Sequence, residues 1–137
     1  MQTPQAVLQL QHEIEKKPSG NLTEVDIEFK LLNLGNAPAT NPCLAIRFKE
    51  IEEVVECKRG WQDATKLNNN VPMIHWQGML PIYCDVSQYI GSVTIRVKEE
   101  TTLLEASVDI QAGNMQRIKG PYTIPIISDL KRESSKN

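Results

Sequence analysis

Apolar and polar residues alternate along several short stretches of the chain. In "TEVDIEFKLL", which contains Val25, Ile27, Phe29 and Leu31, every second residue is apolar and charged residues stand between them. Because successive side chains of a strand point to opposite faces, this pattern predicts strands with one buried face and one solvated face, as in antiparallel sheets. The same period of two recurs in "AVLQLQHEI", "CLAIRF", "SVTIRV", "LLEASVDI" and "YTIPI".

Turn-forming residues separate these stretches. Strands that are interrupted at such short intervals are typical of a sandwich or a barrel. We therefore predict an all-β domain of antiparallel strands. The turn signals are "PSGN" at 18–21, "NLGNAPATNP" at 33–42, "RG" at 59–60, "NNN" at 68–70, "GN" at 113–114 and "GP" at 120–121.

Two segments fit the alternation poorly. In "FKEIEEVVECK" the apolar residues would line one face of a short helix, but we favour the second strand of a hairpin or an edge strand around residues 54–57. Both structures stay open for this segment. The longest irregular stretch, residues 61–71, is predicted to be a loop that crosses between the sheets.

The segment 33–42 is predicted to be a rigid corner between the second and third strands. Gly35 can readily adopt a positive φ, and Asn36 can do so at tolerable cost. Pro38 fixes its own φ and favours an extended conformation for the residue before it. Ala39 is small, as a residue packed beneath a crossing loop must be.

The stretch "VDIEFKLLNLGNAPATNPCLAIRF", residues 25–48, resembles the strand, corner and strand of immunoglobulin-like domains in the bacterial and archaeal cell-adhesion-related group known as CARDB. That resemblance implies an antiparallel immunoglobulin-like β-sandwich, for which we expect seven or eight strands. It implies a fold much more than a function, because unrelated proteins carry such domains.

The length of 137 residues suits one domain. We expect the sandwich to span residues 1–128, followed by a solvated tail at 129–137. The net charge of −2 provides no field that would recruit nucleic acid. No apolar run approaches the roughly 20 residues that span a bilayer, and the N-terminus lacks the pattern of a secretory signal, so no direct membrane insertion is expected.

The chain has three cysteines, Cys43, Cys57 and Cys84. They can form at most one disulfide with each other, which leaves at least one cysteine unpaired. Buried free thiols are the favoured interpretation, and they point weakly to the cytoplasm, whereas the family resemblance points to the cell surface. The compartment therefore stays undetermined. One disulfide with one free thiol also stays open.

Catalysis and metal binding have little support in the sequence. Cys84 or Cys57 could act as a nucleophile with His75, oriented by Asp85, but a strand histidine and core cysteines explain the same residues. The potential metal ligands, including His12, are scattered and lack the close pairs of zinc sites. We predict no enzyme activity, no metal and no cofactor.

The predicted function is a non-catalytic interaction or structural module of a prokaryotic protein, whose partner is another protein or another domain of the same polypeptide. The alternative is a carbohydrate-binding accessory module that uses aromatic residues in loops, since Trp61, Trp76 and Tyr83 lie in or near loops. Of the two tryptophans, Trp61 is expected to be exposed and Trp76 to be in the core. The candidate binding residues, chosen for loop position, are Trp61, Asn36, Asn68, Asn69 and Asn70.

Overall fold

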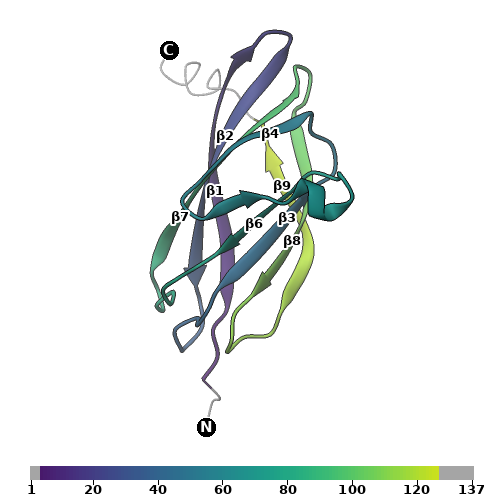
Figure 1. The fold of residues 1–137 in the computed structure, drawn as a ribbon. Helices are drawn as coiled ribbons and strands as arrows, with labels where there is room; N and C mark the ends of the chain where they lie inside the picture. Colours follow the sequence, from purple (N-terminus) through teal and green to yellow (C-terminus); the bar gives the residue numbers. More distant parts are fainter. Residues whose placement is uncertain (1–3, 127–137) are drawn as a thin grey trace, which may run out of the picture.

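The computed structural model describes residues 4–126 and folds them into two antiparallel sheets that pack against each other (Figure 1). The predicted domain end at residue 128 and the tail after it lie outside the described residues. The first sheet has the order β1 (Leu8–Ser19), β2 (Leu22–Asn33), β7 (Ser87–Lys98), β4 (Glu53–Lys58). The second has the order β5 (Trp61–Asp63), β6 (Met73–Gln77), β3 (Cys43–Phe48), β8 (Leu103–Gln111), β9 (Ile118–Pro125).

The strand order is that of an immunoglobulin domain with one addition. The order β1-β2-β7-β4 matches the A-B-E-D sheet, and β3-β8-β9 matches the C-F-G sheet. The antiparallel pair β5 and β6 is inserted between the D and E equivalents and extends the second sheet beyond β3. The predicted antiparallel immunoglobulin-like sandwich is thus confirmed, and with this added pair residues 4–126 form nine strands instead of the expected seven or eight.

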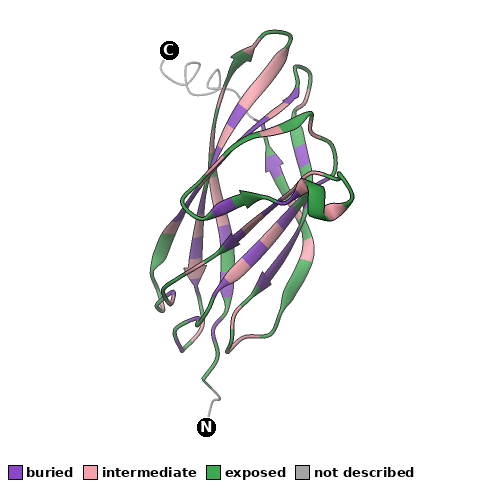
Figure 2. Cartoon of the chain, in the orientation of Figure 1, coloured by how far each residue is buried: buried purple, intermediate pink, exposed green. Residues whose placement is uncertain are grey.

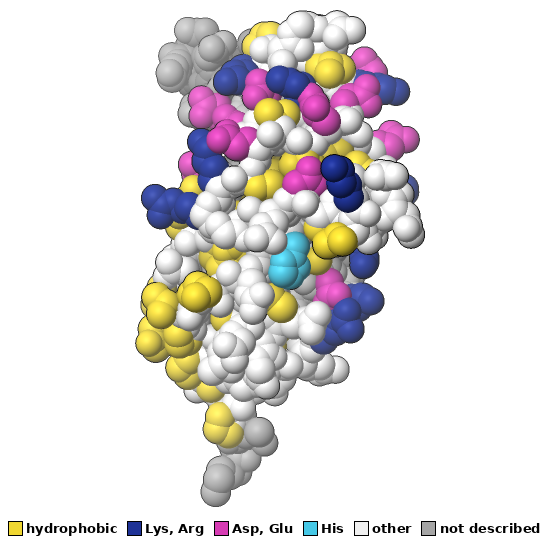
Figure 3. All heavy atoms as spheres, in the orientation of Figure 1, with side chains coloured by type: hydrophobic (Ala, Val, Ile, Leu, Met, Phe, Trp, Pro, Cys, Tyr) yellow, Lys and Arg dark blue, Asp and Glu magenta, His cyan; other side chains and the backbone are white. Residues whose placement is uncertain are grey.

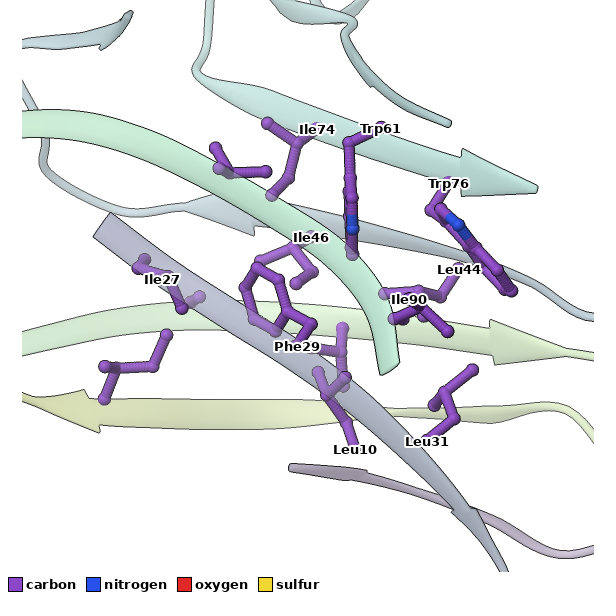
Figure 4. Packing of buried hydrophobic residues seen from close by; sticks show 14 of the residues in the cluster. Leu10, Ile27, Phe29, Leu31, Leu44, Ile46, Trp61, Ile74, Trp76 and Ile90 are labelled. Atoms are coloured by element: carbon purple, nitrogen blue, oxygen red, sulfur yellow. The ribbon is translucent and has the colours of Figure 1, made fainter. Parts of the chain in front are cut away.

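The core lies between the sheets and follows the alternation seen in the sequence (Figure 2). In β2 the side chains of Val25, Ile27, Phe29 and Leu31 are fully buried, whereas Glu28 between them is exposed. Each such side chain contributes roughly 1.5–3 kcal/mol through burial. Residues from both sheets meet in this layer, as Figure 4 shows for ten labelled side chains.

The ambiguous segment around residues 54–57 is an edge strand and not a helix. It forms β4, which pairs with β7 alone. A register shift between Val54 and Glu56 leaves Val55 as an extra residue, a β-bulge. The bulge explains the poor alternation in the sequence, because it changes which residues face inward: Val54 and Cys57 pack against the core.

The prediction that residues 61–71 form the loop that crosses between the sheets is wrong. The chain crosses between the sheets earlier, at Arg59 and Gly60, where both residues have positive φ (58° and 91°) and so reverse the chain sharply. Residues 61–63 then form β5, and a short 3₁₀ helix, η1 (Thr65–Asn68), leads to β6 in the same sheet. Within residues 4–126, no helix has the length and apolar character needed to cross a membrane.

Candidate interaction surface

Four segments meet at one end of the sandwich, the end at the bottom of Figure 1. They are residues 5–7, the corner 33–42, the β6–β7 loop at 78–86 and the β8–β9 turn at 112–117, which we together call the loop end. Backbone hydrogen bonds join them. Ala39 and Ile82 exchange two bonds of 2.8 and 3.0 Å, and the Gly113 amide donates to Thr40 O at 2.7 Å. The antiparallel topology places the three connections and the segment before β1 on one side, where BC and FG loops lie in immunoglobulin domains.

The side chain of Asn33 joins three of these segments. It is fully buried. Its Oδ1 accepts hydrogen bonds from the Val7 amide at 3.2 Å and from the Gly35 amide at 2.9 Å, while its Nδ2 donates to Ala37 O at 2.8 Å and to Ile82 O at 2.9 Å. Both amide atoms are therefore satisfied in a place that water does not reach. The sequence indicated only a turn residue here.

The corner also differs from its prediction at Gly35. Its φ is not positive; the left-handed residue of the corner is Asn41, with φ of 48°. Glycine is required at position 35 for another reason, since a Cβ there would lie 2.2 Å from Gln5 O. Ala39 is fully buried, in agreement with the prediction that a small residue packs at this point.

The predicted asparagine sites divide between two places. Asn36 lies at the loop end, where its Oδ1 accepts from the Gln5 amide at 2.8 Å. Asn68, Asn69 and Asn70 lie at η1, away from the loop end (Figure 1). The Asn68 Nδ2 donates to Val71 O at 3.1 Å, and the next two residues have φ of 54° and 64°, so these side chains and backbones shape a turn. Binding by these asparagines stays a prediction.

The expectation that Trp61 is exposed is wrong. Only 4% of it is accessible, because β5 pairs with β6 and turns the indole inward, where its ring lies 4.9 Å from that of Phe29 (Figure 4). Its Nε1 is buried and has no hydrogen-bond partner in the described part of the chain. Trp76, predicted to be in the core, is also buried, at 6%. Neither indole therefore presents a face on which a sugar could stack.

Sequence reasoning missed an apolar groove at the side of the loop end. It has a volume of about 610 Å³ and runs between the β6–β7 loop and the crossing at Arg59. Trp76, Ile82 and Ile90 line it from the core side, and Met79 and Leu80 stand exposed on the loop, at 95% and 76%. Figure 3 shows the hydrophobic patch at lower left, over the place of the β6–β7 loop. The apolar run "MLPIY" was the available signal.

The loop end carries few charges. The corner "NLGNAPATNP" has none, the β6–β7 loop has only Asp85, and Arg117 in the β8–β9 turn is held by an ion pair with Asp109. On the face seen in Figure 3, charged side chains gather over the upper part and along one side. The charged outer face of the first sheet forms a hollow of about 410 Å³, lined by six carboxylates, among them Glu13 and Asp26, and by two lysines. We interpret that hollow as a solvated face.

The residues considered for nucleophilic catalysis are not assembled into a site. His75 on β6 and Cys84 in the β6–β7 loop form no hydrogen bond with each other among residues 4–126. Burial, followed by the charges of Asp63 and Glu56, raises the pKa of Cys57 to about 11. Burial also raises the pKa of Cys43.

All three cysteines are free thiols, so the structure contains no bridge between them. Within residues 4–126, no group of three His, Cys, Asp or Glu side chains is placed to hold a metal ion.

His12 joins the two edge strands β1 and β9. Its Nδ1 lies 2.5 Å from the hydroxyl of Tyr122, and the rings meet edge to face, 5.4 Å apart. Burial lowers the pKa of His12 and raises the pKa of Tyr122 to about 12, so both groups are neutral at pH 7. The pair lies on a seam between the sheets and is a structural contact.

No protein-family model and no curated protein matches this chain. Among solved structures, domains D2 and D3 of the major pilin SpaD from Corynebacterium diphtheriae are similar, with 14% identity over 85% of this chain and 51% of theirs, and a TM-score of 0.43. The full-length SpaD pilin gives 14% identity, 85% and 35% coverage, and a TM-score of 0.41. The chain thus spans about half of the first structure and about a third of the second. These values carry no argument about function, and membership of the CARDB group stays a prediction.

Proposed function

We propose that this domain is a non-catalytic protein-binding module and that the loop end is its contact surface. The observation that carries this proposal is the exposure of Met79, Leu80 and Tyr83 side by side on one loop, at 95%, 76% and 60%. Single exposed apolar residues are ordinary, but a contiguous group rimmed by polar residues marks interaction sites. Leu34 and Val86, at 56% and 44%, extend the apolar character of this end.

The loop that carries these residues is held in place before any partner arrives. Ile82 is paired with Ala39 in both directions, and the Asp85 amide donates to Asn33 O at 2.9 Å. A surface that is already ordered loses less conformational entropy on binding than a flexible loop. In β-sandwiches, binding residues commonly lie on loops that the rigid sheets hold in position.

The partner that fits this surface is another protein or a neighbouring domain of the same polypeptide. The resemblance of residues 25–48 to cell-adhesion-related domains favours a module within a larger prokaryotic protein. Of the three aromatic residues named for the carbohydrate-binding alternative, Trp61 and Trp76 are buried and only Tyr83 is exposed, so the two indoles give that alternative no support.

A selection experiment tests the proposal. A phage-displayed library of random peptides is panned against the wild-type domain, against the double variant Met79→Ser/Leu80→Ser and against the control Leu67→Ser/Val71→Ser. The control residues are exposed too, at 88% and 46%, but lie near η1. We expect the selected peptides to bind the wild type and the control but not the Met79→Ser/Leu80→Ser variant. The thermal unfolding of both variants should match that of the wild type. Equal binding to all three proteins, or no enriched peptide, would contradict the proposal.

A further inference from the structure

Arg59 stands on the wall of the apolar groove that faces the β6–β7 loop. Its guanidinium lies over the ring of Tyr89, 5.4 Å from the ring centroid, and both residues line the groove. Stacking on an aromatic face restrains the guanidinium and leaves its N–H groups free to donate at the edges. The cation is therefore held at the groove without being neutralised by the contact.

No ion pair explains why arginine occupies this position. Among residues 4–126, no carboxylate lies within ion-pair distance of Arg59 or of the exposed Arg47 on β3, whereas Arg96 and Arg117 both have carboxylate partners. Arg59 also has a positive φ of 58°, a conformation that glycine or asparagine adopts at lower cost. A strained backbone that carries an unneutralised cation on the rim of a groove is the kind of feature found at binding sites.

The remaining lining of the groove is apolar, aromatic or amide. Arg59 is its one charged residue in the described chain, and Gln77 and Gln88 supply further hydrogen-bonding groups. The complement of such a surface is a segment with apolar side chains and a carboxylate beside them. The concave shape, with Trp76 and Ile90 at its base, favours inserted side chains over the flat surface of a bilayer.

We infer that the apolar groove binds an extended protein segment in which an acidic residue stands among apolar residues, and that Arg59, stacked on Tyr89, binds its carboxylate. This inference rests on the proposed function, since it names the partner chemistry of the same surface. Apolar contacts with the exposed side chains of Met79, Leu80 and Tyr83 supply most of the buried area. The hydrogen bonds from Arg59 to the carboxylate are charge-assisted and set the selectivity.

Three pools of acetylated, amidated pentapeptides test the inference. The central residue is Asp in the first pool, Asn in the second and Lys in the third, and the flanking positions are mixtures of Leu, Ile, Val, Phe and Tyr. Binding is followed by tryptophan fluorescence, in which the signal of Trp76 at the base of the groove is superposed on that of Trp61, in the wild type and in Arg59→Gln, Arg59→Lys and Arg47→Gln. Arg47 is the matched control, an exposed arginine on β3 outside the groove.

The Asp pool is expected to bind the wild type about five- to twentyfold more tightly than the Asn pool, in the range of a charge-assisted hydrogen bond at a partly exposed site. That preference should disappear in Arg59→Gln, shrink in Arg59→Lys and persist in Arg47→Gln. Thermal unfolding of each variant confirms that it is folded.

Other outcomes separate this inference from the proposed function. If all pools bind alike and Arg59→Gln changes nothing, the acidic specificity is wrong, whereas loss of binding in Met79→Ser/Leu80→Ser would still support a protein-binding surface. If no pool binds, the inference is overturned. Sedimentation with phosphatidylglycerol vesicles, lost in the same double variant, would show instead that a lipid surface is the occupant.

Discussion

At the scale of the residue, Asn33 illustrates how one polar side chain can organise a fold. It is buried at the place where the second strand ends, and it satisfies groups on three segments. An aliphatic residue there would fill the space but leave backbone groups unpaired in the interior. Such groups cost about 1–3 kcal/mol each when their partner is removed.

Replacement of Asn33 by alanine is therefore expected to lower the free energy of unfolding by about 3–5 kcal/mol, because the Val7 and Gly35 amides and the Ala37 carbonyl lose their partner. Urea denaturation followed by circular dichroism measures the change. Asn21→Ala, at an exposed turn position, is the matched control and should shift stability by less than about 0.5 kcal/mol. A similar loss in both variants would refute the role assigned to Asn33.

Gly35 offers a second test, one of steric fit. Gly35→Ala places a Cβ 2.2 Å from Gln5 O, so the N-terminal segment must move, at an expected cost of about 1–3 kcal/mol. In Gly120→Ala the new Cβ meets nothing within 4 Å, and φ is not positive. That control should be neutral or slightly stabilising, by up to about 1 kcal/mol. Thermal unfolding compares the two, and equal effects would count against the close approach.

Residue-scale roles were only partly predictable from the sequence. Turn composition marked residues 33–42 correctly, and the small size of Ala39 suggested packing. The partners of Asn33, however, include groups 26 and 49 positions away, and the reason for Gly35 is a backbone from the N-terminal segment. Such contacts depend on the assembled fold and leave no local pattern.

At the scale of the element, alternation was sufficient wherever a strand was regular. It predicted β2 and its inward residues correctly, left β4 undecided between an edge strand and a helix, and missed β5. In β4 a bulge at Val55 interrupts the period. In β5 only three residues pair, too few for a period to be recognised, so Trp61 was placed in a loop.

The inward position of Trp61 leads to a prediction for the β5–β6 pair. Trp61→Ala is expected to destabilise the domain by about 3–5 kcal/mol, because it removes a buried ring that packs on Phe29. Equilibrium unfolding in urea measures the loss. Tyr83→Ala, which truncates an aromatic residue that is 60% exposed, is the control and should cost far less. A near-neutral Trp61→Ala would mean that β5 does not close the core.

The seam between β1 and β9 should make stability depend on pH. Because burial lowers the pKa of His12 in the folded state, the unfolded chain binds its proton more readily. The contribution of neutral His12 to the free energy of unfolding is thus fully present above the unfolded pKa of about 6.5. This contribution declines as the pH falls through the folded pKa of His12. Midpoints of urea unfolding between pH 7.5 and 5 measure this slope, which His12→Gln should flatten.

Two further variants complete that test. His75→Gln, on β6, removes the other histidine and leaves the contact between His12 and Tyr122 in place, so it is the comparison variant for the slope. Tyr122→Phe removes the hydroxyl that contacts His12 Nδ1 and should cost about 1 kcal/mol at pH 7.5. An unchanged slope in His12→Gln would assign the pH dependence to other groups.

At the scale of the whole molecule, the reaction rates of the cysteine thiols measure how far the fold protects them from reagents. With a pKa of about 11 instead of 9.0, the thiolate fraction of Cys57 at pH 8 is about a hundredfold smaller than that of an unperturbed thiol. Reaction of Cys57 with a chromogenic disulfide reagent should therefore be slow in the native Cys43→Ser/Cys84→Ser variant and fast in urea. The unreduced, unfolded wild type should titrate as three thiols. Fast native reaction would contradict the burial of Cys57.

The candidate surface was the least predictable feature, because it is a property of the assembly. Its segments lie as far apart in the chain as Ala6 and Asn114, which share a backbone hydrogen bond, and they meet only when both sheets have formed. One indication of this surface was nevertheless present in the sequence, since "NLGNAPATNP" and "MLPIY" both lack charged residues. Arg59 next to Gly60 was visible as a turn, but its stacking on Tyr89 depends on β7.

The pairing of the first strand has a mechanical consequence. The described chain enters β1 at the loop end and leaves β9 at the opposite end (Figure 1). Tension between these points would pull β1 along β2, with which it forms an unbroken antiparallel ladder from Leu8 to Ser19. Because ladder hydrogen bonds lie perpendicular to the strands, this load shears them together instead of opening them one after another. The domain should therefore resist force along its long axis far better than force that peels β5 from its short edge.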